Sequence, residues 1–393
     1  MTLSRDTTLD NWLLDPFDRR SFQRVREFVP TALITRLDGE PTILQEDPID
    51  IGRVEFEGRD GGTTTVAKQL ASSYAEGLCV IKDGRIVHEQ YLNGMTPRTP
   101  HLLMSVSKSF CGALLGVQVG KGLLSRDLLV TDVAPEFAGT SLDGAQVSHV
   151  IDMTAGTEFV EDYDEYEDPE AATALLEYER HAGYRRLGAR EPVGVLGHFR
   201  TYPLAQPHGS WFDYRSPLTN IAARLVEIVT DMPYPEALSR ELWGPLGQEF
   251  DADIMLDPLG FPVVEGGMSC ALRDLARFGL AYLQDGRSGN RQVVPQAWVL
   301  DTRQGDDAGV QAFTDSPTVD KKTHENWSMY RNAFWVLERD RVYSGLGIHG
   351  QYCYVHMPAN VVIARFSTYP LAMPEDLSQE TLRSLQAIAE SLA

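Results

Sequence analysis

Ser105 and Lys108 have the residue types and the spacing that could generate an oxygen nucleophile. Ser105-Val-Ser-Lys108 is the only Ser-x-x-Lys in the chain, which has six lysines. Side chains three residues apart lie on the same side of a helix, so the amine can reach the hydroxyl. Burial would lower the pKa of the amine and let it accept the serine proton. The motif taken alone is more typical of a helix start with Ser105 as N-cap and Lys108 in solvent.

The surroundings of this pair favour the catalytic interpretation. Leu102, Leu103 and Met104 precede it, and Phe110 and a run of small residues follow it. We therefore predict a buried helix that begins just after Ser105. A lysine without a function would be costly in such a helix.

Two further segments carry groups suited to acyl transfer. Pro207–Ser216 ends in Tyr-x-Ser, and the phenol of Tyr214, held between the serine and the lysine, could pass protons to a leaving group. The glycine-rich segment Ser344–Gln351 lies at the start of a predicted strand, where a backbone N–H could form an oxyanion hole with that of Ser105. The alternatives are a half-buried tyrosine with a satisfied hydroxyl and a glycine-rich turn without a ligand.

Together the three elements resemble the serine β-lactamase and penicillin-binding-protein family, with its Ser-x-x-Lys, Tyr-x-Asn/Ser and Lys-Thr-Gly-like motifs. Val147–Gly156, Leu242–Gly247 and Gly266–Arg277 are similar to connecting sequences of that family, so the resemblance covers nearly the whole chain. Within the family, His101–Ser109 and Gly347–Gln351 look most like the branch of nylon-oligomer hydrolases and related carboxylesterases.

The resemblance implies roles at the reaction centre. Ser105 would be the nucleophile, Lys108 and Tyr214 its proton partners, and the N–H groups of Ser105 and Ile348 the oxyanion donors. Gly345-Leu-Gly347 stands at the Lys-Thr-Gly position, so the cation that binds a β-lactam carboxylate is missing. This difference weakens the expectation of β-lactamase activity.

The resemblance also implies substrate-binding positions. Tyr166, Glu179 and Glu265 match a tyrosine that closes over the amide, a carboxylate that holds a free amine, and the residue before a Gly-Gly pair. Glu265 departs from the family pattern, which has Asn or His there. Ser216 and His349, inside the matching motifs, are further candidates. Two carboxylates would suit an amine-bearing substrate, and surface charges are an equal alternative.

Periodicity and turn signals indicate the elements that must position these residues. Gly77–Lys82 and Arg85–Tyr91, joined by Asp-Gly, predict an antiparallel hairpin. Three successive strands are expected over Asn332–Glu338, Gln351–Met357 and Asn360–Phe366, and a last helix over 376–392 should cover their sheet.

Further helices are expected over 106–119, 220–229, 234–242 and 269–283, and Val147–Gly156 should be a helix that ends in a turn. The acidic, tyrosine-rich stretch Glu158–Glu170 is too charged for a core, which predicts a loop on the surface or over a cleft.

The predicted fold class is α+β: an α/β sandwich with an antiparallel sheet plus an inserted all-α domain, as the resemblance to serine β-lactamase-like proteins implies. Residues 1–125 would form the first part of the α/β domain with an N-terminal extension. Residues 126–224 would form the mostly helical insertion, and 225–393 the second part of the α/β domain.

Composition and charge argue against several classes of partner. The chain of 393 residues is 43% hydrophobic and 23% charged, which is typical of a globular protein. Its net charge of −21 would repel nucleic acid and anionic membranes. The N-terminus lacks the apolar stretch of a secretory signal, so a cytoplasmic location is expected.

No cofactor and no metal are expected. The nine histidines include no His-Glu-x-x-His, and the chain has no phosphate-binding glycine motif and no Gly-x-Ser-x-Gly. Cys79, Cys111, Cys270 and Cys353 are scattered and should be buried free thiols. The expected partner is a small-molecule amide or ester substrate, and a homodimer is left open.

Three functions fit these observations. The first is a hydrolase of short linear amides or esters that forms an acyl-enzyme on Ser105, with water activated by Lys108 and Tyr214. The second is a carboxylesterase or β-lactam-hydrolysing enzyme without amidase activity. The third is a catalytically idle protein that binds a ligand in the same pocket. The intact Ser105, Lys108 and Tyr214 favour a hydrolase.

Overall fold

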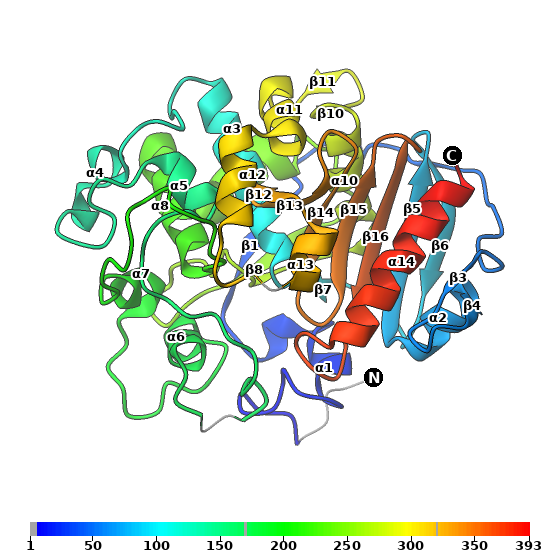
Figure 1. The fold of residues 1–393 in the computed structure, drawn as a ribbon, viewed down its shortest axis with the longest axis horizontal. Helices are drawn as coiled ribbons and strands as arrows, with labels where there is room; N and C mark the ends of the chain where they lie inside the picture. The colour runs from blue at the N-terminus through cyan, green and yellow to red at the C-terminus, as the bar shows by residue number, and fades with distance from the viewer. Residues whose placement is uncertain (1–5, 169–170, 320) are drawn as a thin grey trace.

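The main sheet is assembled from both ends of the chain. The computed structural model describes residues 6–168, 171–319 and 321–393. Figure 1 shows the early strands β5 and β6 beside the late strand β16. In sheet order the strands are β12 (Met329–Arg331), β13 (Phe334–Glu338), β14 (Val342–Gly347), β15 (Gln351–His356), β16 (Val361–Ser367), β5 (Ala75–Lys82), β6 (Arg85–Tyr91) and β2 (Gln45–Glu46). Neighbours pair antiparallel, except β6 and β2, which are parallel.

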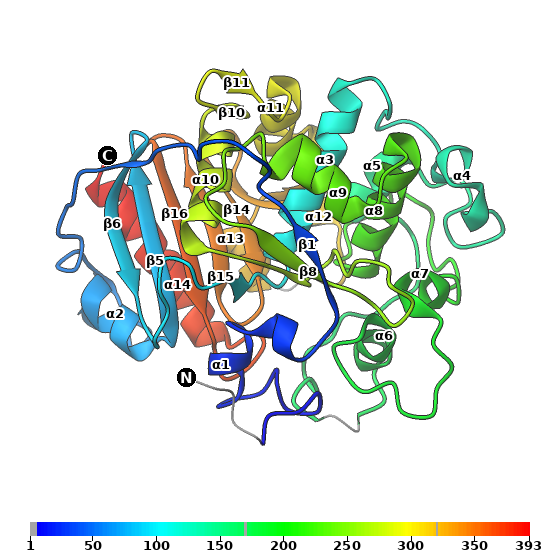
Figure 2. The same ribbon diagram turned by 180° about the vertical axis from the view of Figure 1, so that it is seen from behind.

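Helices cover both faces of this sheet. The helix α10 (Leu272–Leu283) packs on β5, β15 and β16, and α14 (Glu375–Ser391) covers the opposite face, as Figures 1 and 2 show from the two sides. Strands β15 and β16 are therefore buried along their whole length instead of alternating between buried and exposed residues. The predicted hairpin and the predicted last helix are confirmed.

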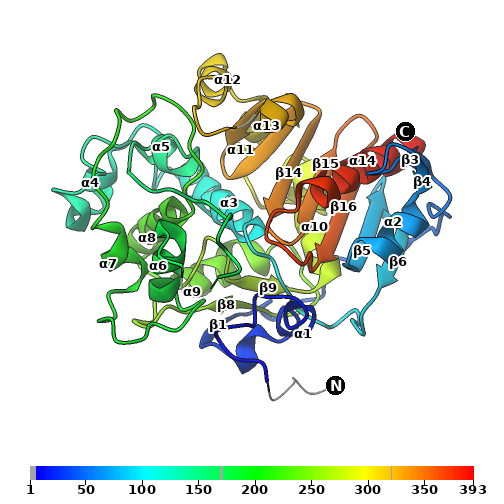
Figure 3. The same ribbon diagram turned by 60° about the horizontal axis from the view of Figure 1, so that its bottom comes forward.

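The helical region lies beside the sheet, at the end away from β6 (Figure 1). It contains α4 (Val130–Val133), α5 (Val147–Ile151), α6 (Ala174–Ala182), α7 (Gly194–Phe199) and α8 (Pro217–Thr230). Between this region and the sheet lies α3 (Val106–Gly120), which packs on α8 and β14 (Figure 3). Buried residues run from Val106 to Gln118, as predicted for this helix. The domain limits stay a prediction, and α8 spans the limit expected after 224.

A second, four-stranded sheet holds the chain just before Ser105. Its order is β1 (Thr31–Ile34), β8 (Ala252–Met255), β9 (Met268–Cys270) and β7 (His101–Leu102). The expectation of a helix from Ser269 is wrong at its start, because Ser269 pairs with Leu102 in this sheet and α10 begins at Leu272. A three-residue strand is too short to show periodicity.

Two other expectations need correction. The three late strands are not successive, because β14 lies between β13 and β15, and its glycines hide the alternation of a strand. The helix expected over 234–242 is α9 (Tyr234–Leu238), followed by a π-helical turn over Ser239–Trp243.

The remaining elements are short or peripheral. They are α1 (Asp18–Ser21), a 3-10 turn (Val25–Glu27), β3 (Glu55–Glu57), β4 (Thr63–Thr65), α2 (Val66–Ser72), a 3-10 turn (Pro135–Phe137), β10 (Arg287–Ser288), β11 (Arg291–Gln292), α11 (Gln296–Gln304), α12 (Asp307–Thr314) and α13 (Lys321–Asn326). All four cysteines are free and buried, as predicted. Within the described ranges, none of the helices combines the length and the apolar character needed to cross a membrane.

Candidate active site

Ser105 lies in a tight turn between β7 and α3. Met104 before it has a φ of 46°, in the left-handed region, and Ser105 itself is the N-cap of α3. Its side chain makes no capping hydrogen bond, so the hydroxyl is not used as a helix cap. The free N–H groups and the dipole at a helix N-terminus favour negative charge, such as an oxyanion that forms beside this hydroxyl.

Lys108 is buried directly beneath this hydroxyl. Its Nζ donates to Ser105 Oγ at 2.8 Å and to the backbone carbonyl of Glu265 at 2.6 Å. Burial lowers the pKa of the amine to about 8, although the charges of Glu161 and Glu265 act to raise it. The alternative of a lysine in solvent is therefore wrong. The amine can exchange a proton with Ser105 close to neutral pH.

Tyr214 lies beside the same pair. Lys108 Nζ is 5.1 Å from the centre of the Tyr214 ring, which stacks on Trp335 at 5.4 Å. Burial raises the pKa of the Tyr214 hydroxyl well above its usual range, while the contact with Ser105 lowers it. The phenol therefore keeps its proton and lies where it could give that proton to a leaving group.

Two glycines let the end of β14 approach Ser105. A Cβ at Gly347 would lie 2.6 Å from the carbonyl oxygen of Leu103 and 3.1 Å from the nitrogen of Ser105. A Cβ at Gly345 would lie 2.9 Å from the hydroxyl of Ser109. Because these positions carry no side chain, the following residue, Ile348, lines the same cleft as Ser105.

Glu161 is a site residue that sequence reasoning missed. Its carboxylate accepts hydrogen bonds from the N–H and hydroxyl of Ser216, at 2.6 and 2.7 Å, and from the hydroxyl of Tyr163 at 2.6 Å. The acidic stretch is a loop, as predicted for its described residues 158–168, and its last two residues lie outside the described part of the chain. Of the two predicted positions, the surface or over a cleft, the structure shows the second for part of the loop, because Glu161 lines the cleft and Tyr166 is buried.

The cleft above Ser105 has a volume of about 510 Å³, a size usual for small-molecule sites. Its apolar lining comes from loops and strands far apart in the sequence: Phe159, Val160, Phe212, Val319, Trp335, Leu346, Ile348 and Met373. A second cavity of about 30 Å³ adjoins it at Ser105. That smaller cavity is lined by Lys108, Glu161, Tyr163, Tyr166, Tyr178, Glu179, Tyr184, Ser216, Glu265 and Ile348, among others.

The carboxylate of Glu179 already has a cationic partner. Arg185 Nε donates to it at 2.6 Å, and Arg185 Nη2 donates to the backbone carbonyl of Tyr166 at 2.8 Å. The guanidinium also lies 4.8 Å from the centre of the Tyr166 ring. Burial raises the pKa of Glu179, and Arg185 opposes that rise. A substrate amine would have to compete with this arginine for Glu179.

The ring of His349 lies 6.2 Å from the ring of Tyr166, another predicted substrate-binding residue. Its Nδ1 is 2.8 Å from the carbonyl oxygen of Tyr369, and its ring packs edge-on against Phe22 at 5.3 Å. It is not among the residues that line the cleft or the smaller cavity. Its substrate-binding role stays a prediction.

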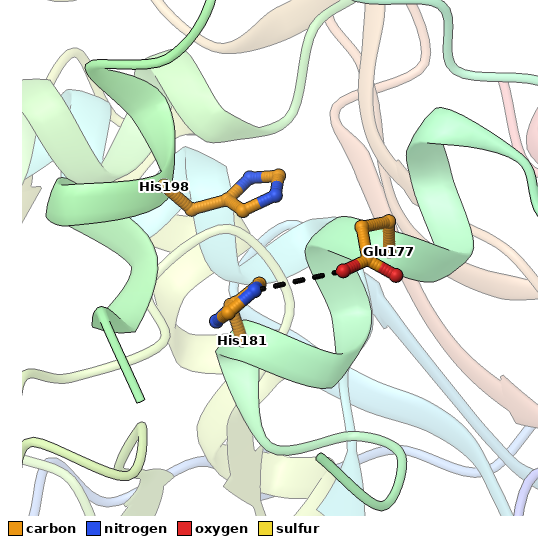
Figure 4. A group of neighbouring side chains, drawn as sticks. All are labelled: Glu177, His181 and His198. Atoms are coloured by element: carbon orange, nitrogen blue, oxygen red, sulfur yellow. Dashed lines mark ion pairs between the residues drawn. The ribbon is translucent and has the colours of Figure 1, made fainter. Parts of the chain in front are cut away.

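Outside the cleft, three side chains of the described residues have the types that could hold a metal ion. Glu177 and His181 lie four residues apart on α6, and His198 faces them from α7 (Figure 4). Sequence reasoning did not single out this spacing. However, Arg180 and Arg190 contact the Glu177 carboxylate at 3.1 and 2.7 Å, so a cation would have to displace them. We assign no metal to this cluster.

Comparison with known proteins places this chain in a family. A family model described as beta-lactamase matches residues 64–388. The chain belongs to the beta-lactamase family. The 6-aminohexanoate-dimer hydrolase of Paenarthrobacter ureafaciens is 33% identical over 367 residues, which are 93% of this chain and 89% of that protein.

Solved structures agree with this beta-lactamase-family fold. A Bacillus anthracis protein, provisionally named as a 6-aminohexanoate-dimer hydrolase, superposes with a TM-score of 0.88 and 21% identity over 100% of this chain and 99% of that one. A family VIII carboxylesterase superposes with a TM-score of 0.56 and 14% identity, covering 83% of this chain and 95% of that one. The predicted α+β, serine β-lactamase-like fold is confirmed, and this member of the beta-lactamase family is a hydrolase.

Proposed function

We propose that this protein cleaves short linear amides or esters through an acyl-enzyme formed on Ser105. The observation that carries this proposal is the buried Lys108 amine, 2.8 Å from Ser105 Oγ beside an open cleft. In its neutral form the amine accepts the serine proton while Oγ attacks the carbonyl carbon. The N–H groups of Ser105 and Ile348 bind the oxyanion that forms.

The proton then moves to the leaving group. Tyr214, which keeps its proton and lies beside Ser105 and Lys108, donates to the departing amine or alcohol and regains a proton from Lys108. Water attacks the acyl-enzyme, the acid leaves, and Ser105 recovers its proton. Each step uses a group that lies within the cleft or its adjoining cavity.

A linear amide is the first substrate class to test, because the relative that matches most of this chain is named as a 6-aminohexanoate-dimer hydrolase. An ester with an apolar acyl group is the second. Two observations favour the ester: Arg185 already pairs with Glu179, and apolar side chains line much of the cleft, beside the acids Glu161, Asp162, Asp164 and Asp213. A β-lactam is less suited, because Gly345-Leu-Gly347 offers no cation for its carboxylate.

The test compares the wild type with Ser105→Ala on three substrates: a short p-nitrophenyl ester, linear 6-aminohexanoate dimer and a chromogenic cephalosporin. Ser125→Ala, at an exposed serine outside the cleft, is the matched control. We expect a covalent fluorophosphonate adduct and product release with the wild type and the control, and neither with Ser105→Ala. Activity in a well-folded Ser105→Ala protein would refute the mechanism. The substrate that is cleaved distinguishes amidase from esterase.

A further inference from the structure

Glu265 is a buried acid that lacks a hydrogen-bond partner of good geometry among the described residues. The residue is 3% exposed, and neither of its carboxyl oxygens has a hydrogen-bond partner among the described residues. Tyr178 and Asn220 lie near enough to lower the pKa of the carboxyl, and Asn220 Nδ2 donates to Tyr178 Oη at 2.6 Å. Buried polar groups normally have a hydrogen-bond partner. This carboxyl is therefore placed to form hydrogen bonds with a molecule that enters from outside the protein.

The carboxyl lies in the small cavity that adjoins the cleft at Ser105. A water molecule needs about 10–15 Å³ of such volume, so a cavity of about 30 Å³ has room for one or two waters. It does not have room for a whole aminoalkyl chain. Its size suits a water molecule beside the Glu265 carboxyl.

The other acids of this cavity are already engaged. Glu161 accepts hydrogen bonds from Ser216 and Tyr163, and Glu179 is paired with Arg185. Lys108 is the cationic residue that lines this cavity. Its amine donates to the backbone carbonyl of Glu265 and to Ser105 Oγ. Among the described carboxylates that line the cavity, Glu265 is the one with both oxygens unpaired.

We propose that Glu265 is a catalytic residue that holds the hydrolytic water and takes its proton during deacylation. This proposal rests on the acyl-enzyme proposed above. The water oxygen bonds to the acyl carbon while one water proton passes to the Glu265 carboxylate. The bond from that carbon to Ser105 Oγ then breaks as the proton on Glu265 passes through the neutral Lys108 amine to Oγ. The acid is released, and Glu265, Lys108 and Ser105 return to their starting states.

The electrostatic surroundings suit this role. Burial raises the pKa of Glu265 to about 7, and Lys108 opposes that rise. Glu161, Glu179, Tyr178 and Tyr184 also line the cavity. A carboxylate with such a pKa is partly ionised at neutral pH and is a stronger base than an exposed one.

The test separates acylation from deacylation in Glu265→Gln, which keeps the size of the side chain and removes its basicity. A p-nitrophenyl ester reports acylation as a burst of nitrophenol and deacylation as the steady rate that follows. Mass spectrometry of the intact protein measures the acyl-enzyme. Glu158→Gln, at an exposed acid outside the cleft, is the matched control.

We expect Glu265→Gln to keep its burst, to lose about 100-fold in the steady rate, and to accumulate an acyl-enzyme. Hydroxylamine, a nucleophile that needs no base, should restore turnover. An unchanged steady rate without an acyl-enzyme would overturn the role of Glu265, and so would an equal loss of burst and steady rate without rescue. Failure of the proposed function looks different, because the wild type itself would then show no adduct at Ser105.

Discussion

The unpaired carboxyl of Glu265 should make the stability of this protein depend on pH, and Glu265→Gln should remove that dependence. In the folded protein, burial raises the pKa of this group from 4.5 to about 7. Because the folded pKa lies above the unfolded one, the folded state binds the proton more tightly. The contribution of this group to the free energy of unfolding therefore falls as the pH rises from about 4.5 to about 7.

The size of the effect follows from the two pKa values. A rise from 4.5 to about 7 corresponds to about 3 kcal/mol lost above pH 7. The effect of Lys108 is already contained in the pKa of about 7, because the ammonium opposes the rise that burial causes. We expect Glu265→Gln to be more stable than the wild type by about 3 kcal/mol at about pH 8.5, and by less than about 1 kcal/mol at about pH 5.

Urea unfolding followed by circular dichroism at both pH values measures this difference. Glu158→Gln, at an exposed carboxyl, should show nearly the same small change at the two pH values. A stability difference between Glu265→Gln and the wild type that does not change with pH would refute the reasoning. So would a variant that is less stable than the wild type at the higher pH, because the carboxylate would then have a partner.

Three further results are expected. The acylation rate should rise as the pH rises through about 8, because Lys108 must lose its proton to act as a base, and a burst rate that stays flat across this range would contradict that role. Gly347→Ala should lower kcat by about 100-fold with the fold intact, because its Cβ would press on Leu103 and separate the oxyanion donors; unchanged kcat would argue against that hole. Arg185→Met should lower the free energy of unfolding by about 3 kcal/mol, measured by calorimetry, because it leaves Glu179 buried and unpaired. The control Arg186→Met, at an exposed ion pair with Asp10, should lower it by less than about 1 kcal/mol. Equal losses in the two variants would contradict the argument.

The parts of the site that depend on neighbours in the chain were predictable. Ser105 and Lys108 lie three residues apart on one helix, so their contact follows from helix geometry once α3 is expected to be buried. The β5–β6 hairpin follows from two β-rich runs and an Asp-Gly turn. Both features could be predicted because residue spacing and turn residues within a short stretch of sequence determine them.

The strands that frame the cleft were harder to predict. The glycines of β14 bring its end against Ser105, but they also remove the alternating pattern by which a strand is recognised. The strand β9 is three residues long and forms because it pairs with β7, which lies more than 160 residues earlier in the chain. When a short strand forms by pairing with a segment this far away in the chain, its own sequence has little local pattern that would predict it.

The chain alone determined the family motifs and the pairing of Ser105 with Lys108, because these depend on residue type and on spacing within one element. Only the tertiary structure decided which acids serve the site. Glu161 bonds to Ser216, 55 residues away, Glu179 is paired with Arg185, and Glu265 is left unpaired beside Lys108. In the sequence, Glu161, Glu179 and Glu265 are all simply glutamates, and their surroundings along the chain do not distinguish their roles. What distinguishes these acids is which groups the fold packs against each of them, because a buried carboxylate takes its pKa and its chemistry from its partners.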